Sequence, residues 1–222
     1  MNIPVILAAA VLALSGCASQ QPGAVPSTPS NSRPAPTPST VITTPRSAPQ
    51  PPVQQPTPQP PAGLRFVHSP GVVAWDEHLQ PGQCAAKVID AAAGLVLPDP
   101  ACTPGAVDPD VTTATLQTTI CKTGYTATVR PPASETNKFK AAALAAYGMA
   151  ADPSIELDHL IPLELGGANS ASNLWPEMNR AGATGTTNPK DALENRLHMA
   201  VCSGALTLET AQQIILDWAH NL

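Results

Sequence analysis

The first 62 of the 222 residues lack acidic side chains altogether, and Arg33 and Arg46 are the only basic ones among them. From Ala18 to Ala62 large apolar residues are also scarce, and the chain is mostly Pro, Ser, Thr, Gln and Ala. Such a stretch buries too little apolar surface to offset the entropy lost on ordering, which excludes a packed core here. Because proline-rich chains favour the extended polyproline II conformation, we predict a disordered linker that reaches on the order of 100 Å.

Residues 1–16, MNIPVILAAAVLALSG, are apolar and end on small side chains, which is typical of an export signal. Cys17 follows, and the order Leu-Ser-Gly-Cys resembles the bacterial lipobox, in which the cysteine is acylated and becomes the mature N-terminus. An ordinary signal peptide with a chance cysteine, or an uncleaved anchor, is the alternative. We therefore expect a lipoprotein signal peptide over 1–16 and, over 17–62, a lipidated cysteine with the linker.

A lipid on Cys17 would attach the protein to a membrane of the cell envelope. Ala18, rather than an aspartate, follows the cysteine. By resemblance to the lipoprotein sorting rule, this favours the outer membrane in a Gram-negative host. In any other host the same anchor implies the outer face of the plasma membrane. No protein partner is inferred from the sequence.

Residues 63–222, enough for one core, lack a surplus of basic side chains. They hold all sixteen acidic residues, and eleven basic residues less the two linker arginines leave nine, so their net charge is about −7. A tight, nonspecific nucleic-acid binder ordinarily has the opposite balance, because it must neutralise phosphates. The balance counts against such a binder, although only weakly, because a bound cation can bridge an acidic enzyme and a phosphate.

The sequence contains no Cys-x-x-Cys pair, which makes a zinc site the weaker interpretation of its cysteines. The four cysteines of the folding part are Cys84, Cys102, Cys121 and Cys202. An even number in an exported domain indicates two disulfides. Spacing alone does not choose among the three possible pairings. We favour Cys84–Cys102 and Cys121–Cys202, since the second would tie the middle of the domain to its C-terminal helices.

The residue pattern of 63–222 predicts an α+β fold. Segments with strand-like content are 64–75 (as a pair of strands), 118–132, 154–161 and 173–177. Segments with helical patterns are 83–94, 134–147, 189–203 and 207–221. Asn188-Pro189 is a good helix start, with Asn as the N-cap and Pro at the first helical position. A loop is expected over 97–110.

Residues 157–177, LDHLIPLELGGANSASNLWPE, place an Asp-His pair before a Pro-Leu turn, two glycines and an Asn-Leu pair. This order resembles the core of the HNH endonuclease family, a ββα-metal hairpin and helix. The resemblance spans about 45 residues, from Glu156 to Cys202, and weakens towards its end. It implies an HNH-like core with extra helices over 151–222. Residues 63–150 are then the N-terminal part of the globular domain, without an assigned role.

Hydrolysis of a phosphodiester needs a deprotonated water, stabilisation of the charge on phosphorus and help for the leaving oxygen. A neutral imidazole is a suitable base, and a divalent cation held by a carboxylate supplies the rest. The resemblance implies that Asp158 binds the metal, that His159 activates water, and that Asn173 braces the loop and orients the imidazole through its carbonyl. Because neighbouring strand residues face opposite sides, the Asp-His pair would straddle the scissile phosphate at a strand end.

The third metal ligand is where the chain departs from the family pattern, because residues 178–189 intervene before the helix. His198 would complete the His-Asn-His order and suit zinc, manganese or nickel, and we favour it. Glu194, one turn earlier on the same face, would give an all-oxygen site suited to magnesium. Other polar groups on this helix are Asp191 and Asn195. In the alternative interpretation the apolar residues pack the helix and its polar residues meet solvent.

Other polar and aromatic residues carry less information. Arg130 and Lys190 could contact a phosphate. The histidines His68, His78 and His220 are isolated in the sequence, and we interpret them as surface residues or as histidines with satisfied hydrogen bonds, rather than as ligands. Trp175 and Trp218 are expected in the core rather than as stacking platforms for bases.

Three hypotheses follow. The leading one is a membrane-anchored, metal-dependent HNH-like endonuclease that cleaves nucleic acid outside the cytoplasm, DNA rather than RNA, with Mg²⁺, Mn²⁺ or Zn²⁺. The second is a non-catalytic envelope lipoprotein that uses the same fold as a binding scaffold, which the acidic charge favours. The third is a metal-dependent hydrolase of another phosphoester.

Overall fold

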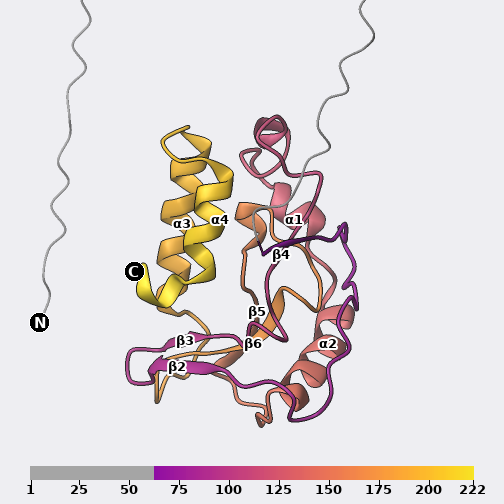
Figure 1. Ribbon diagram of the computed structural model, residues 1–222, viewed down its shortest axis with the longest axis vertical. Helices are drawn as coiled ribbons and strands as arrows, with labels where there is room; N and C mark the ends of the chain where they lie inside the picture. Colours follow the sequence, from indigo (N-terminus) through magenta and orange to yellow (C-terminus); the bar gives the residue numbers. More distant parts are fainter. Residues whose placement is uncertain (1–62) are drawn as a thin grey trace, which may run out of the picture. The chain divides into compact units, whose positions relative to one another are not determined.

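A computed structural model describes residues 63–222 (Figure 1), which belong to one compact unit. The predicted signal peptide, the lipidation site Cys17 and the linker lie outside the described residues. The described part of the chain mixes helices with small sheets, so the α+β prediction is confirmed at that level. No helix in this part of the chain has both the length and the apolar character needed to cross a membrane.

Strands in the described residues pair two by two. The pairs are β1 (Arg65–Phe66) parallel to β4 (Ala106–Val107), β2 (Lys87–Asp90) antiparallel to β3 (Leu95–Leu97), and β5 (Ile155–His159) antiparallel to β6 (Leu174–Met178). The strands predicted over 154–161 and 173–177 are therefore confirmed as one hairpin. Segment 64–75 does not form a strand pair by itself, because its one strand pairs with the distant β4.

Four helices and three 3-10 turns complete the described part. They are α1 (Tyr125–Val129), α2 (Ala133–Ala146), α3 (Pro189–Cys202), α4 (Leu208–Leu216), η1 (Leu116–Thr118), η2 (Leu163–Leu165) and η3 (Trp218–His220). Figure 1 shows α3 and α4 side by side, while α2 lies against β6. The β5–β6 hairpin thus has helices on both sides.

Two further predicted elements are wrong. The segment 83–94 forms β2 and the turn of the β2–β3 hairpin instead of a helix. Its turn is closed by Asp90, whose side chain accepts from two following backbone N–H groups at 2.9 and 3.1 Å, and by Gly94 at φ 75°. An aspartate that bonds its own backbone favours a turn over a helix, even in an alanine-rich stretch.

The strand predicted over 118–132 is replaced by turns and the short helix α1. Gly124, at φ 81°, leads the chain into this helix, and Pro131 follows soon after its end. The hydroxyl of Thr128 donates to the backbone carbonyl of Tyr125 at 2.6 Å. The threonines that suggested a strand are therefore accommodated by local hydrogen bonds in a helix.

Helix α3 begins where the sequence predicts. The Asn188 side chain accepts from the backbone N–H of Lys190 at 2.8 Å, and Asp191 accepts from the Asn188 backbone N–H at 3.1 Å. This capping box and Pro189 at the first helical position fix the helix start. The last predicted helix is shorter than expected, because it ends at Leu216 and the chain continues as the 3-10 turn η3.

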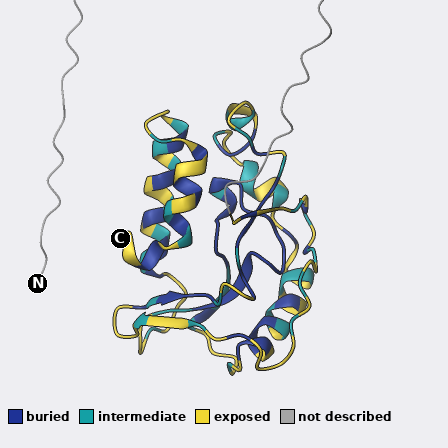
Figure 2. Cartoon of the chain, viewed as in Figure 1, coloured by how far each residue is buried: buried dark blue, intermediate teal, exposed yellow. Residues whose placement is uncertain are grey.

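The main hydrophobic core draws on both 63–150 and 151–222 (Figure 2). Trp175 and Trp218 are fully buried in it, as predicted. The buried faces of the helices are Phe139, Ala143 and Leu144 on α2, Leu193, Leu197 and Val201 on α3, and Leu208, Ala211 and Ile215 on α4. The two halves of the domain therefore share the main core, while Phe139 and Ala143 of α2 belong to a second, smaller cluster.

Both predicted disulfides are present. Cys84–Cys102 closes a short loop, whereas Cys121–Cys202 joins positions 81 residues apart and ties the end of α3 to the middle of the domain. Each bridge contributes about 2–4 kcal/mol to stability, chiefly by restricting the unfolded chain. Two disulfides also indicate an oxidising, extracytoplasmic environment.

Candidate functional site

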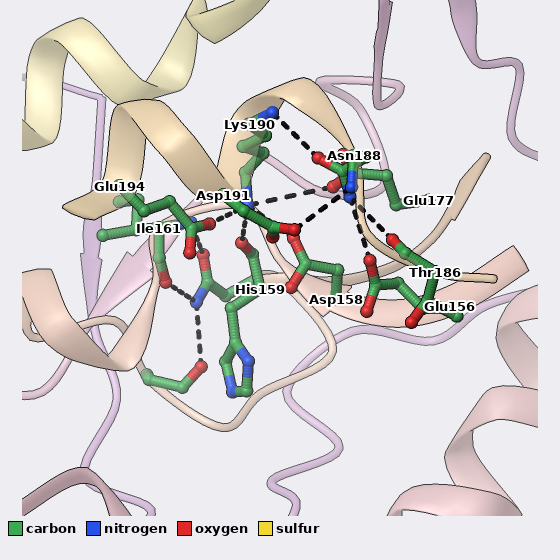
Figure 3. A network of polar contacts seen from close by, with 12 residues as sticks. Glu156, Asp158, His159, Ile161, Glu177, Thr186, Asn188, Lys190, Asp191 and Glu194 are labelled. Carbon is green, nitrogen blue, oxygen red and sulfur yellow. Dashed lines mark hydrogen bonds and ion pairs between the residues drawn. The ribbon is translucent and has the colours of Figure 1, made fainter. Parts of the chain in front are cut away.

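The Asp-His pair occupies the last two positions of β5. Asp158 lies opposite Trp175 and His159 opposite Leu174 in the antiparallel register. Because successive strand residues alternate between faces, the two side chains point to opposite sides of the hairpin. Figure 3 shows the His159 imidazole directed away from the carboxylates that gather around Asp158. The two side chains thus lie in separate environments.

On one side, Asn169 fixes the protonation of the His159 imidazole. The Asn169 Nδ2 group donates to the backbone carbonyls of Ser69 and Val129, both at 2.9 Å. These two acceptors determine which end of the amide is nitrogen, so Oδ1 is the atom that lies 2.9 Å from His159 Nε2. The oxygen can only accept, so Nε2 carries the hydrogen. Nδ1 is then the ring nitrogen with the free lone pair.

The His159 imidazole is uncharged at neutral pH. Burial lowers the pKa of His159 to about 4, against the opposing pull of Asp158 and of the bond to Asn169. Arg130 and Lys190 act in the same direction as burial. A neutral imidazole with a lone pair on a defined nitrogen is able to accept a proton.

His159 lines a pocket of about 360 Å³ beside α2. The lining residues are Arg130, Pro131, Ala133, Thr136, Asn137, Lys140, Glu156, Leu157, His159 and Leu174. Lys140 Nζ donates one hydrogen to the Ile155 carbonyl at 2.6 Å, and its ammonium has two more. The structure therefore brings Arg130, one of the two predicted phosphate contacts, together with His159 and with a second cation that sequence reasoning missed.

Asn173 braces the loop but does not bond the imidazole. Its Oδ1 accepts from the Ile161 N–H at 2.9 Å, and its Nδ2 donates to the Ile161 and Ala168 carbonyls, also at 2.9 Å. A side chain on Gly167 would put a Cβ atom 1.7 Å from the Ile161 carbonyl oxygen, so only glycine fits there. The side chain that orients His159 is Asn169, which lies in the same Gly-Gly-Ala-Asn loop.

On the other side of the hairpin, a buried lysine lies among carboxylates (Figure 3). Lys190 Nζ contacts Asp158 Oδ2, lies 2.5 Å from Glu194 Oε1, and donates to the His159 backbone carbonyl at 2.8 Å. Glu177 Oε2 is 3.8 Å away. The Lys190 side chain is only 1% exposed. Its predicted role as a phosphate contact is wrong in this structure, because the ammonium is buried and already paired.

The charges of this cluster depend on one another. Burial alone would lower the pKa of Lys190, but attraction by Asp158, Glu177 and Glu194 outweighs it and raises that pKa above its usual range. Burial would raise the pKa of Asp158, but Lys190 holds it below its usual value. Burial raises the pKa of Glu194 to about 7 despite Lys190, and burial with repulsion from Asp158 raises that of Glu156 to about 7.

Glu177 is the most constrained carboxyl group of the cluster. It is 1% exposed, and among the described residues neither of its oxygens receives a hydrogen bond. Burial raises the pKa of Glu177 well above its usual value, with Asp158 adding to the effect. A protonated Glu177 becomes a donor, and Asp158 is the acceptor beside it.

His198 lies apart from Asp158. Its Nε2 is 2.9 Å from the Ile120 carbonyl oxygen, in a different pocket of about 200 Å³ that Glu164 and residues 120–126 also line. The Cys121–Cys202 disulfide holds that segment against the end of α3. Of the two candidate helix ligands, the structure therefore groups Glu194, and not the favoured His198, with Asp158.

A second group of ligand-type side chains appears where the sequence suggests none. His68 Nδ1 lies 3.2 Å from Asp108 Oδ1 and 3.6 Å from Asp110 Oδ2. The parallel pairing of β1 with β4 brings these distant residues together, so His68 is not isolated. The His68, Asp108 and Asp110 group could hold a metal ion. The sequence signal that was missed is the Asp-x-Asp spacing directly after β4.

Comparisons of the chain with protein-family models, with curated proteins and with solved structures each gave no match. The likeness to the HNH endonucleases therefore rests on the residues of the hairpin and its helix, and it stays a prediction.

Proposed function

We propose that the protein is a hydrolase of phosphodiester bonds, an endonuclease acting on nucleic acid outside the cytoplasm, with His159 as its general base. The observation that carries this proposal is the His159 pocket. It combines an uncharged imidazole, a defined Nδ1 lone pair, and the cationic side chains Arg130 and Lys140. A phosphate bound there would meet a base and two positive charges.

The chemistry assigned to this pocket starts with a water molecule. His159 Nδ1 takes a proton from the water as its oxygen forms a bond to phosphorus, and the bond to the leaving oxygen breaks. Arg130 and Lys140 stabilise the negative charge that develops on the phosphoryl oxygens. The proton on Nδ1 is then available to the leaving oxygen. Asn169 Oδ1 keeps the ring in place and stabilises the imidazolium that forms.

The domain's acidic charge counts only weakly against this assignment, because two cations, Arg130 and Lys140, line the pocket together with one carboxyl group, that of Glu156. A phosphodiester contacts a few groups, whereas the net charge of about −7 is summed over 160 residues. DNA is the proposed substrate rather than RNA. The location outside the cytoplasm follows from the predicted export signal and lipid anchor, and the two disulfides are compatible with it.

The metal implied by the family resemblance does not fit the arrangement of side chains around Asp158. Asp158 and Glu194 are suitable oxygen ligands for a divalent ion. However, the Lys190 ammonium contacts both of them and lies between them. We therefore assign no step of the reaction to a metal at Asp158.

The test is plasmid nicking by the full chain purified from an oxidising host. His159→Ala should lower the rate by about 10²–10⁴, the usual cost of losing a general base. His78→Ala is the matched control, because His78 is exposed and lies outside the pocket, and it should nick like the parent. Equal nicking by His159→Ala and the parent would refute the proposal.

A binding scaffold without catalysis is the second candidate. The buried Lys190 favours it, because an HNH-like core without its metal lacks part of the family's machinery. In that case a short oligonucleotide should bind the parent and not an Arg130→Ala/Lys140→Ala variant, while no cleavage occurs.

A further inference from the structure

The Lys190 ammonium has a complete set of partners. An ammonium group has three N–H donors, and three oxygen atoms receive them: Asp158 Oδ2, Glu194 Oε1 and the His159 carbonyl oxygen. These oxygens come from one strand and one helix and converge on a single point. Such convergence of carboxylate and carbonyl oxygens is what a divalent cation site offers. Here the point is occupied by a nitrogen of the chain itself.

The place of Lys190 in α3 shows that its partners, and not local preferences, hold it there. It is the second residue of the helix, after Pro189, where the helix dipole disfavours a positive charge. Its pair with Glu194 runs with the lysine first, the less favourable order on a helix. The capping box at Asn188 fixes the backbone so that the side chain reaches β5.

We infer that the Lys190 ammonium is a built-in cation that takes the place of a divalent metal ion beside Asp158, so that the β5–β6–α3 unit is complete without a metal there. The ammonium connects α3 to the strand that bears His159. The inference does not depend on the proposed hydrolysis, because it concerns metal binding and folding and not cleavage.

A metal ion could enter this position only if the ammonium left it. A divalent ion and an ammonium within a few ångströms repel each other, and Lys190 remains charged at any ordinary pH. Removing the side chain, in contrast, would leave the carboxyl groups of Asp158, Glu194 and Glu177 around an empty space. Such a variant should acquire the metal affinity that the parent lacks at this position.

The first experiment uses the parent protein and lysine acetylation by acetic anhydride, read by mass spectrometry with and without Mn²⁺. Lys190 should stay unmodified in both conditions. Lys138, whose side chain is 71% exposed, is the matched control and should be modified in both. Acetylation of Lys190 that appears only with Mn²⁺ would show that the metal displaces the ammonium, which would overturn the inference.

The second experiment compares the thermal unfolding of four full-length proteins with and without saturating Mn²⁺. Lys190→Ala should be destabilised without metal and should gain about 5 °C or more in Tm with Mn²⁺. The gain should vanish in Lys190→Ala/Asp158→Asn. Mn²⁺ bound elsewhere would raise the Tm of the parent and of an Asp158→Asn variant equally. We expect the Tm shift of the parent to equal that of Asp158→Asn, because no metal binds beside Asp158 in the parent.

Two results would overturn the inference. One is a metal-dependent shift of the parent that Asp158→Asn abolishes. The other is a Lys190→Ala protein that gains no more from Mn²⁺ than the double variant. If Lys190→Ala does not fold without metal, its refolding on Mn²⁺ addition supports the inference. If it folds under neither condition, the acetylation experiment on the parent decides alone.

Discussion

The two faces of the β5–β6 hairpin differ in whether a nitrogen-bearing side chain, His159 on one and Lys190 on the other, has all its hydrogen-bonding atoms paired. On the His159 face a neutral imidazole lines a pocket with Arg130 and Lys140. On the Asp158 face the partly buried carboxylate lies against an ammonium that has no donor left over. The alternation of a strand thus places the side chains of two neighbouring residues in different surroundings, one beside a pocket and the other in an ion-pair cluster.

The largest effect should come from a substitution on the Asp158 face. Lys190→Met removes the cation and leaves Asp158, whose side chain is 23% exposed, without a positive partner, so the free energy of unfolding should fall by up to about 3–5 kcal/mol, the loss expected for a fully buried pair. Urea unfolding at neutral pH measures it. Lys138→Met is the control, since the Lys138–Glu135 ion pair lies at the surface and its loss should cost less than about 1 kcal/mol. A small effect at Lys190 would mean that its carboxylate partners are not ionised.

The second effect is a pH dependence of stability that arises from Glu194. Its carboxyl group has a pKa of about 7 in the folded protein and about 4.5 in the unfolded chain, so the folded state binds more protons between these values. Its contribution is fully present below pH 4.5 and is lost as the pH rises through 7. The loss is about 3 kcal/mol, from roughly 2.5 pH units at 1.36 kcal/mol each.

Glu194→Gln should remove this dependence. The free energy of unfolding of the variant, relative to that of the parent, should increase by up to about 3 kcal/mol as the pH rises from 4.5 to 8. His159 changes the parent's stability in the opposite sense, because its lowered pKa makes stability fall as the pH drops from 6.5 towards 4. Both proteins share this contribution, so it cancels in the difference. A difference that does not vary with pH would contradict the burial of Glu194.

The third prediction concerns the His159 face and changes Asn169, the residue that positions the imidazole. Asn169→Asp places a carboxylate beside Nε2 and should raise the pKa of His159 from about 4 by about 1–3 units. The acid limb of the pH–rate profile for nicking should move upwards by the same amount. Asn169→Ala should lower the rate by about 10–100-fold. Asn221→Ala, at an exposed amide that bonds only backbone carbonyls, is the control.

How far the sequence predicted this structure depends on the range of the interactions involved. The hairpin and the start of α3 were predicted, because strand-like composition and an Asn-Pro cap are local signals. The two favoured disulfide pairings are confirmed, although the spacing of the cysteines alone did not choose among the three possible pairings. The β2–β3 hairpin and α1 were missed, because a turn closed by Asp90 and helical threonines reverse the preferences of their segments.

The candidate site was predicted only in part, because some of its residues follow from a local pattern and others from tertiary contacts. Asp158, His159 and Glu194 could be named from a local pattern, and the structure places Glu194 beside the partner of Asp158. Asn169 could not be separated from Asn173 by sequence, because the choice depends on the carbonyls of distant segments. Lys190 carried a local sign, a lysine in the first turn of a helix, but its burial against β5 is a property of the tertiary fold.

The smallest effect should come from the group formed by His68, Asp108 and Asp110, which neither lines the His159 pocket nor contacts Lys190. Tetrahedral Zn²⁺ with ligands at about 2.0–2.2 Å places neighbouring ligand atoms about 3.3–3.6 Å apart. The distances from His68 Nδ1 to the two aspartate oxygens are 3.2 and 3.6 Å, which suits such an ion. The affinity should be modest, because this group supplies three ligands and two of them are exposed.

At a Zn²⁺ concentration ten times the Kd, the parent should gain about 1.4 kcal/mol, which is about 3–6 °C in Tm. Asp108→Asn should remove the gain, because it takes away the one buried ligand of the three. Asp217→Asn is the matched control, since it breaks the other exposed histidine–aspartate pair, with His220 at 2.6 Å, and should keep the full Zn²⁺ effect. A parent that does not respond to Zn²⁺ would reduce the group to an ordinary ion pair, in which the hydrogen bond and charge of Asp108 raise the pKa of His68.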